Sequence, residues 1–174
     1  MPYDGRAVAN FVLDLGDERS RPLTNMQLQK IVYFCHAWSL VELRRPLVKH
    51  QFEAWEHGPV LQYLYRQFKD FGSAPIRKRA VELDRITGNQ VTARAEFLAE
   101  DEYLIRQQSE IYMSFSASQL RAISHVEGGP WERVWKTDAG IRVGMKIQDD
   151  SIACFYAANR NAFYEEGLES KWRN

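Results

Sequence analysis

Residues 23–34 read LTNMQLQKIVYF, and residues 52–60 read FEAWEHGPV. The first segment opens with capping-box spacing, in which Thr24 accepts from the amide of Gln27 and the Gln27 side chain reaches back to the cap amide. Apolar residues then recur at helical spacing, so we expect the central helix of the domain here. The stripe consists of Leu28, Ile31, Val32 and Cys35, widened by Tyr33, Phe34 and Trp38.

The second segment predicts another helix start at Gly58-Pro59. Proline costs nothing at the first helical position, because that amide has no intrahelical partner. Gly72 is placed to end this helix in a left-handed conformation. Between the two helices, the alternation at 52–54 indicates a short extended segment that resembles an edge strand.

The flanking sequence adds further helices. Their expected starts are Asp4, residue 97, Ser116 with Gln119 as a second capping box, Pro130 and Ser151. Residues 76–94 differ, because Gly88-Asn89 between runs with β-branched residues is a two-residue hairpin signal. We expect a small β-hairpin or short sheet there, joined by the 52–54 segment.

The chain as a whole predicts one mainly α domain over 1–174 with minor β structure. We expect a loop at 137–146 and a frayed tail at 167–174. Its length of 174 residues is enough for a real core. No apolar run approaches the roughly 20 residues of a membrane span, and no signal peptide opens the chain, so a cytoplasmic location is the default.

The balanced charge and the two cysteines argue against a nucleic-acid-binding protein and against a disulfide-bonded one. Lysine plus arginine equals aspartate plus glutamate at 23 each, so no global field would hold nucleic acid. Cys35 and Cys154 both lie in apolar stripes, and we expect two buried free thiols.

Three residues near expected helix ends are candidates for chemistry: His57, His125 and Glu127. If they converged in one pocket they would suit a small enzyme, which remains an alternative. They lack the spacing of a metal motif, and the glycines do not form a phosphate-binding loop. We therefore expect no catalytic set, metal or cofactor.

A basic triplet, Arg77-Lys78-Arg79, supports a second alternative, a nucleic-acid-binding regulator. Acidic residues follow closely in the sequence. They argue against an extended basic groove.

Tryptophan is abundant, at five residues, with Trp55 and Trp131 each beside an expected helix start. Core filling is the ordinary explanation. The alternative is an aromatic anchor in a protein interface, where Trp, Tyr and Arg dominate binding energy.

An ordered series of blocks resembles one family. The blocks are 23–38, Arg45-Pro46-Leu47, 53–60 with Tyr65, Ser116-Ala117 with Leu120, His125 with Glu127, and Pro130-Trp131. Together they resemble the Panacea domain of SocA-like antitoxins and phage-associated proteins, over nearly the whole chain. Two features depart from the pattern: His57, where an aromatic residue is common, and the extra glycine before Pro130.

The resemblance implies an antitoxin that neutralises a cognate toxin, encoded by a neighbouring gene, through direct binding. Within this family the domain can also act as an adaptor that delivers the toxin to a Clp-type protease. From the length we expect no appended helix-turn-helix domain, which weakens the idea that this chain alone represses its own operon. We expect the partner-binding residues to be Trp55, His57, Tyr63, His125, Glu127 and Trp131.

Overall fold

The computed structural model of the chain describes residues 1–136 and 145–163. The helices are α1 (Gly5–Glu18), α2 (Asn25–Trp38), α3 (Gln62–Phe68), α4 (Ala99–Tyr112), α5 (Ala117–Ser124), α6 (Pro130–Trp135), α7 (Asp149–Ala158) and α8 (Arg160–Phe163). A π-helical turn, Ser39–Leu43, extends α2, and a 3₁₀ turn, Lys69–Phe71, extends α3. The strands are β1 (Glu53–Trp55), β2 (Gly58–Val60), β3 (Val81–Leu83), β4 (Gln90–Thr92) and β5 (Met145–Lys146). The expected mainly α fold with minor β structure is confirmed.

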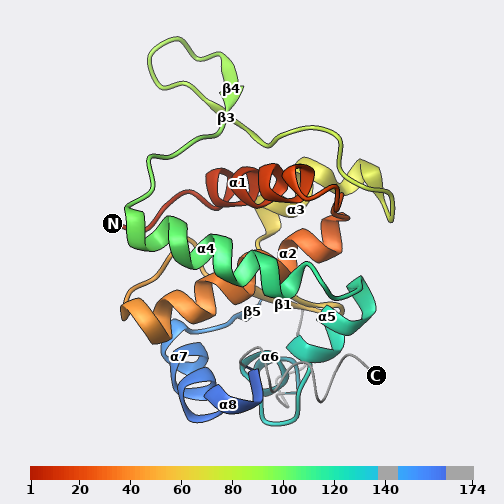
Figure 1. Ribbon diagram of the computed structural model, residues 1–174, viewed down its shortest axis with the longest axis vertical. Coiled ribbons are helices and arrows are strands. Elements are labelled where there is room, and N and C mark those ends of the chain that lie inside the picture. Colours follow the sequence, from red (N-terminus) through yellow and green to blue (C-terminus); the bar gives the residue numbers. More distant parts are fainter. Residues whose placement is uncertain (137–144, 164–174) are drawn as a thin grey trace.

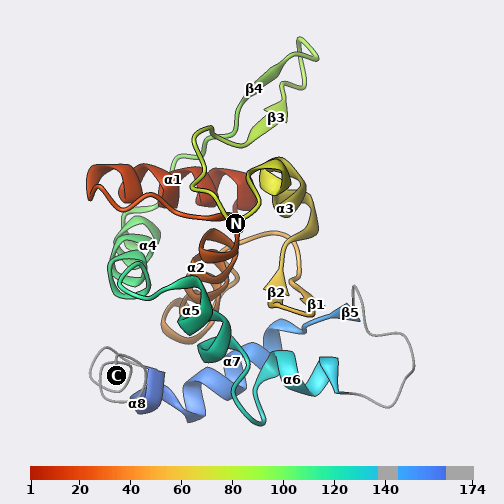
Figure 2. The same ribbon diagram turned by 90° about the vertical axis from the view of Figure 1, so that its right-hand side faces the viewer.

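Helix α2 is the centre of the molecule, as its sequence predicts. The capping box is present: the Gln27 amide donates to Thr24 Oγ1 over 3.3 Å, and the Thr24 amide donates to Gln27 Oε1 over 3.1 Å. Twelve of its fourteen residues are buried. Helices α1, α4, α5 and α7 pack around it, and β2 covers part of its remaining surface (Figures 1 and 2).

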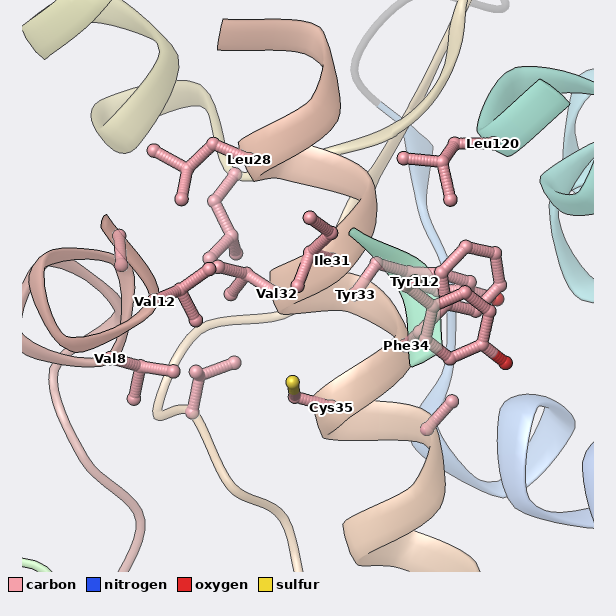
Figure 3. Packing of buried hydrophobic residues seen from close by; sticks show 14 of the residues in the cluster. Val8, Val12, Leu28, Ile31, Val32, Tyr33, Phe34, Cys35, Tyr112 and Leu120 are labelled. Atoms are coloured by element: carbon pink, nitrogen blue, oxygen red, sulfur yellow. The ribbon is translucent and has the colours of Figure 1, made fainter. Parts of the chain in front are cut away.

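The core lies on both sides of this helix. Val8 and Val12 of α1 pack on one side, and Tyr112 of α4 lies on the other (Figure 3). The rings of Phe34 and Tyr112 stack with centroids 4.1 Å apart and planes 8° apart. The Tyr112 hydroxyl also accepts from Trp38 Nε1 over 3.0 Å, so the buried phenol is hydrogen-bonded.

The predicted helix start at Gly58-Pro59 is wrong. Gly58–Val60 forms β2, which pairs antiparallel with β1, and the helix begins only at Gln62. Strand β2 is an edge strand of the sheet β2-β1-β5, a position that tolerates proline because the missing amide breaks no ladder. A helix-opening proline and an edge-strand proline carry the same local signal.

The extended segment at 52–54 also has different neighbours from those expected. It contributes to β1, the central strand between β2 and β5, and does not join the 76–94 hairpin. Met145–Lys146, placed in the expected loop, forms β5; the rest of that loop, 137–144, lies outside the described residues. The predicted frayed tail at 167–174 lies outside them too.

The hairpin within 76–94 is confirmed, although its turn is longer than two residues. Strands β3 and β4 pair in the register Val81↔Thr92 and Leu83↔Gln90, leaving six residues, 84–89, between them. Asp84 organises this loop, since one of its carboxylate oxygens accepts from the amides of residues 86 and 87. The hairpin projects away from the helices as an arm (Figures 1 and 2).

Asp4, Ser116 and Pro130 open helices as predicted. Ser151 does not, because α7 begins at Asp149, where two acidic residues in the first turn suit the helix dipole. Cys35 is a buried free thiol as expected, whereas Cys154 is exposed. Among the described residues, no helix is both long and apolar enough to cross a membrane.

One buried side chain attaches the arm to the body. Asn10 of α1, only 4% exposed, donates to the carbonyls of Ala80 and Ala93 over 2.9 and 2.8 Å. Its Oδ1 accepts from the Ala80 amide over 2.7 Å. All three bonds satisfy backbone groups at the base of the arm.

We expect Asn10→Ala to destabilise the protein by roughly 2–4 kcal/mol, because buried backbone groups lose their partners. Denaturant unfolding measures the loss, and hydrogen exchange should quicken first in β3 and β4. Asn161→Ala, at an exposed position, is the control and should change stability by less than about 0.5 kcal/mol. Unchanged arm exchange in Asn10→Ala would contradict the assignment.

Candidate partner-binding site

The turn between β1 and β2 brings two predicted partner-binding residues to the surface. Trp55 lies opposite Gly58 in the register, so Glu56 and His57 form a two-residue loop. Trp55 is half-buried, and His57 is exposed. Gly58 has a φ of +103°, a conformation that favours glycine.

Space as well as backbone conformation requires glycine at this position. A Cβ at residue 58 would lie 2.8 Å from Cε and Nζ of Lys30 and 2.8 Å from Oγ of Ser124. The turn therefore rests directly on α2 and on the end of α5.

Helix α6 supports the same turn from the other side. Trp131 Nε1 donates to the carbonyl of Trp55 over 2.8 Å, and the Trp131 and His125 ring centroids are 3.6 Å apart. Trp131 is only 5% exposed. Its side chain thus holds the turn in place, which favours the core-filling explanation for this tryptophan over an exposed anchor.

His125 joins the turn to α5. Its Nδ1 lies 2.6 Å from the carbonyl of Arg121, and its Nε2 lies 3.3 Å from the carbonyl of Glu56. Burial lowers the pKa of His125, so the ring is mainly neutral at pH 7 and carries one N–H. The shorter contact assigns this hydrogen to Nδ1, so Nε2 contacts the Glu56 carbonyl without donating a hydrogen bond to it.

The other two predicted residues lie apart from this group. The Tyr63 hydroxyl accepts from the amide of Gly5 over 3.0 Å, and its ring lies 4.8 Å from that of His50. Glu127 is exposed in the turn that connects α5 to α6. The structure therefore gathers Trp55, His57, His125 and Trp131 around one turn, and it places Tyr63 against α1.

The residues of the enzyme alternative do not form a catalytic arrangement in the described part of the chain. The two ring nitrogens of His125 face backbone carbonyls, while His57 and Glu127 are exposed on separate turns. Within residues 1–136 and 145–163, no group of three or more His, Cys, Asp or Glu side chains is placed to hold a metal ion.

The three side chains of the basic triplet do not form one positive surface. Arg79 forms ion pairs with Asp14 and Asp17 at 2.7 and 2.5 Å, and Lys78 lies over the ring of Phe71. Only Arg77 keeps its charge in solvent without a recorded partner among the described residues. This arrangement gives little support to a nucleic-acid surface.

Sequence reasoning missed three polar residues of α2 beneath the turn. Gln29 Oε1 accepts from the amide of Leu61 over 2.9 Å, Asn25 Nδ2 donates to the carbonyl of Tyr65 over 3.2 Å, and Lys30 Nζ donates to the carbonyl of Pro59 over 2.9 Å. All three side chains are buried. Their signal in the sequence was polar residues inside a helix otherwise apolar on every face.

Lys30 is the most unusual of these groups. It is 1% exposed, and burial together with the nearby charge of Arg121 lowers its pKa to about 7. The unfolded chain binds a proton at Lys30 up to its ordinary pKa of 10.5. Burial of this ammonium therefore costs stability below pH 7, and the cost falls as pH rises from 7 towards 10.5.

Comparison with known proteins identifies a family and a relative of this chain. The family model described as "Antitoxin SocA-like, Panacea domain" matches residues 28–132, which include most of α2, the β1–β2 turn, α5 and the start of α6. Antitoxin SocA of Caulobacter vibrioides is 37% identical over 150 residues, covering 86% of this chain and 80% of the relative. No solved structure matches.

The pKa of Lys30 can be tested through stability. Lys30→Met removes the charge. Between pH 7 and pH 9 the free energy of unfolding of the wild type should rise by about 2 kcal/mol relative to that of Lys30→Met, because the buried ammonium of the wild type loses its proton. Urea unfolding at pH 7, 8 and 9 measures this difference. The exposed Lys69→Met is the control and should give a difference independent of pH; a flat difference for Lys30→Met would refute the assignment.

Proposed function

Because this chain belongs to the Panacea-domain family of SocA-like antitoxins, we propose that it is an antitoxin that neutralises a cognate toxin protein by direct binding. The observation that carries this proposal is the 37% identity to an antitoxin over 86% of the chain. The toxin would be the product of a neighbouring gene. The proposed role needs no catalysis, and it would be carried out in the cytoplasm.

We place the toxin contact at the hairpin-turn surface, defined as Trp55, Glu56, His57 and His125, and we add Glu127 of the separate α5–α6 turn as a peripheral residue. Glu56, His57 and Glu127 are exposed, and Trp55 and His125 are half-buried, so all five offer atoms to a partner. Trp131 acts beneath this surface by fixing the Trp55 carbonyl. A turn held by α2, α5 and α6 loses little conformational entropy on binding, which favours affinity.

Tyr63 belongs to the proposed contact only if the toxin extends beyond the turn, because its hydroxyl is bonded to α1. It is half-buried beside His50. We keep it as a peripheral residue of the proposed interface.

Neutralisation can follow two routes, simple sequestration or delivery of the toxin to a Clp-type protease. In the adaptor route, removal of this chain or of the protease lengthens the half-life of the toxin. In the sequestration route, removal leaves the half-life unchanged or shortens it. Pulse-chase measurement of the toxin separates the two.

The antitoxin role predicts a growth phenotype. The product of the neighbouring gene should stop growth when expressed alone, and co-expression of this chain should restore growth. Gly58→Val is a matched control that should fail to rescue, because the added side chain collides with Lys30 and Ser124. A harmless neighbour, or a wild-type chain that does not rescue, would rule out the proposal.

A further inference from the structure

A cleft of about 340 Å³ opens beside the hairpin-turn surface. It lies between the first turns of α2, the β1–β2 turn and the end of α3, which are neighbours in space (Figure 2). The lining residues that matter here are Met26, Gln29, Trp55, Val60, Tyr65 and Lys69. Its volume is within the range of sites that hold a small ligand or a few side chains.

Two aromatic rings form one wall of the cleft. The centroids of Trp55 and Tyr65 are 5.1 Å apart, with their planes at 58°. Trp55 Nε1 donates to Glu53 Oε2 over 2.9 Å, and the other Glu53 oxygen is 2.5 Å from Lys146 Nζ. The indole is therefore fixed before anything binds, whereas Tyr65 is 36% exposed at the mouth.

Two amides line the cleft with unused hydrogen-bonding capacity. Asn25 and Gln29 are 3% and 2% exposed, and Asn25 Oδ1 and Gln29 Nε2 have no hydrogen-bond partner among the described residues. The bonds to the Tyr65 carbonyl and the Leu61 amide fix which end of each amide is free. One acceptor and one donor, a helical turn apart, match the donor and acceptor of a peptide group.

Lys69 gives the rim of the cleft at the end of α3 a positive charge. Its side chain is exposed, with no carboxylate within 4 Å among the described residues. The cleft is also lined by Lys30, His57 and the acidic Glu56. An acidic ligand therefore suits the rim better than a basic one.

We propose that this cleft binds an acidic peptide segment of the toxin, with an apolar side chain seated against Trp55, Tyr65 and Met26. The inference rests on the proposed antitoxin function, because the segment belongs to the neutralised toxin. Asn25 Oδ1 and Gln29 Nε2 are closed to solvent in the free chain, so these two side chains shift on binding to bond to the peptide group of the segment. A neighbouring carboxylate of the segment lies beside Lys69.

Binding of the purified neighbouring gene product, measured by calorimetry, tests the cleft. Tyr65→Ala removes one aromatic wall and Lys69→Glu reverses the rim charge, and each should weaken binding by about tenfold or more. The matched controls are Tyr103→Ala, an exposed tyrosine on α4, and Arg66→Glu, an exposed cation of α3 outside the cleft. Both controls should bind within about twofold of the wild type.

A second readout reports on the amides directly. In nuclear magnetic resonance spectra of the full chain, the side-chain NH₂ signals of Asn25 and Gln29 should shift when the same protein is added. Melting temperatures of the four variants establish that each is folded. Lys69→Glu alters an exposed side chain, so it remains informative if Tyr65→Ala fails to fold.

Each outcome decides the proposal. Binding unaffected by Tyr65→Ala and Lys69→Glu overturns the cleft while leaving the antitoxin role intact. A wild-type chain that does not bind the neighbouring product overturns both proposals. Self-association of the wild type that these variants abolish, seen by sedimentation of the chain alone, would assign the cleft to a second copy and overturn the proposal.

Discussion

The burial of helix α2 on nearly every side is the constraint on which the rest of the structure depends. A surrounded helix must find a partner for each polar side chain it carries, because an unpaired buried polar group costs free energy. Lys30 bonds to β2, Gln29 to the start of α3, and His36 to two further segments. His36 Nδ1 accepts from the amide of Val48 over 3.3 Å, so Nε2 carries the hydrogen that faces Asp149 at 3.1 Å. The irregular segments are thus positioned by hydrogen bonds from the central helix.

The sequence predicted the helices whose starts are determined locally. Thr24 and Ser116 form capping boxes within four residues of chain, so no distant contact is needed to define them. The helix start predicted at Gly58-Pro59 was wrong because the conformation there is determined by residues far along the chain. Lys30 and Ser124 occupy the space around Gly58, and Gly58 and Val60 pair with Trp55 and Glu53 of β1.

Helix α3 starts three residues later than predicted, and this explains why only some of the predicted site residues lie together. With the helix starting at Gln62, Tyr63 turns towards α1, and Trp55 becomes the last residue of a central strand. The grouping of Trp55 with His125 and Trp131 depends on contacts across about 70 residues of sequence, so spacing alone could not predict it. Residue type was more informative, because it selected Trp55, His57, His125 and Trp131, which the structure brings together around one turn.

The cleft and the turn hold two of the five buried side-chain atoms that have no hydrogen-bond partner among the described residues, together with a buried lysine. An ammonium ion is buried there with no recorded carboxylate partner among the described residues, and two amides keep unused polar atoms within one helical turn of each other. Each of these groups costs stability that apolar side chains of similar size would not. Packing alone gives no reason to retain all three beside an open cleft, whereas a partner that supplies the missing hydrogen bonds recovers part of that cost on binding. Buried polar groups without hydrogen-bond partners beside a cleft are typical of functional sites. This grouping favours the cleft over the projecting arm as the place where the partner is recognised, since the exposed side chains of the arm are already solvated.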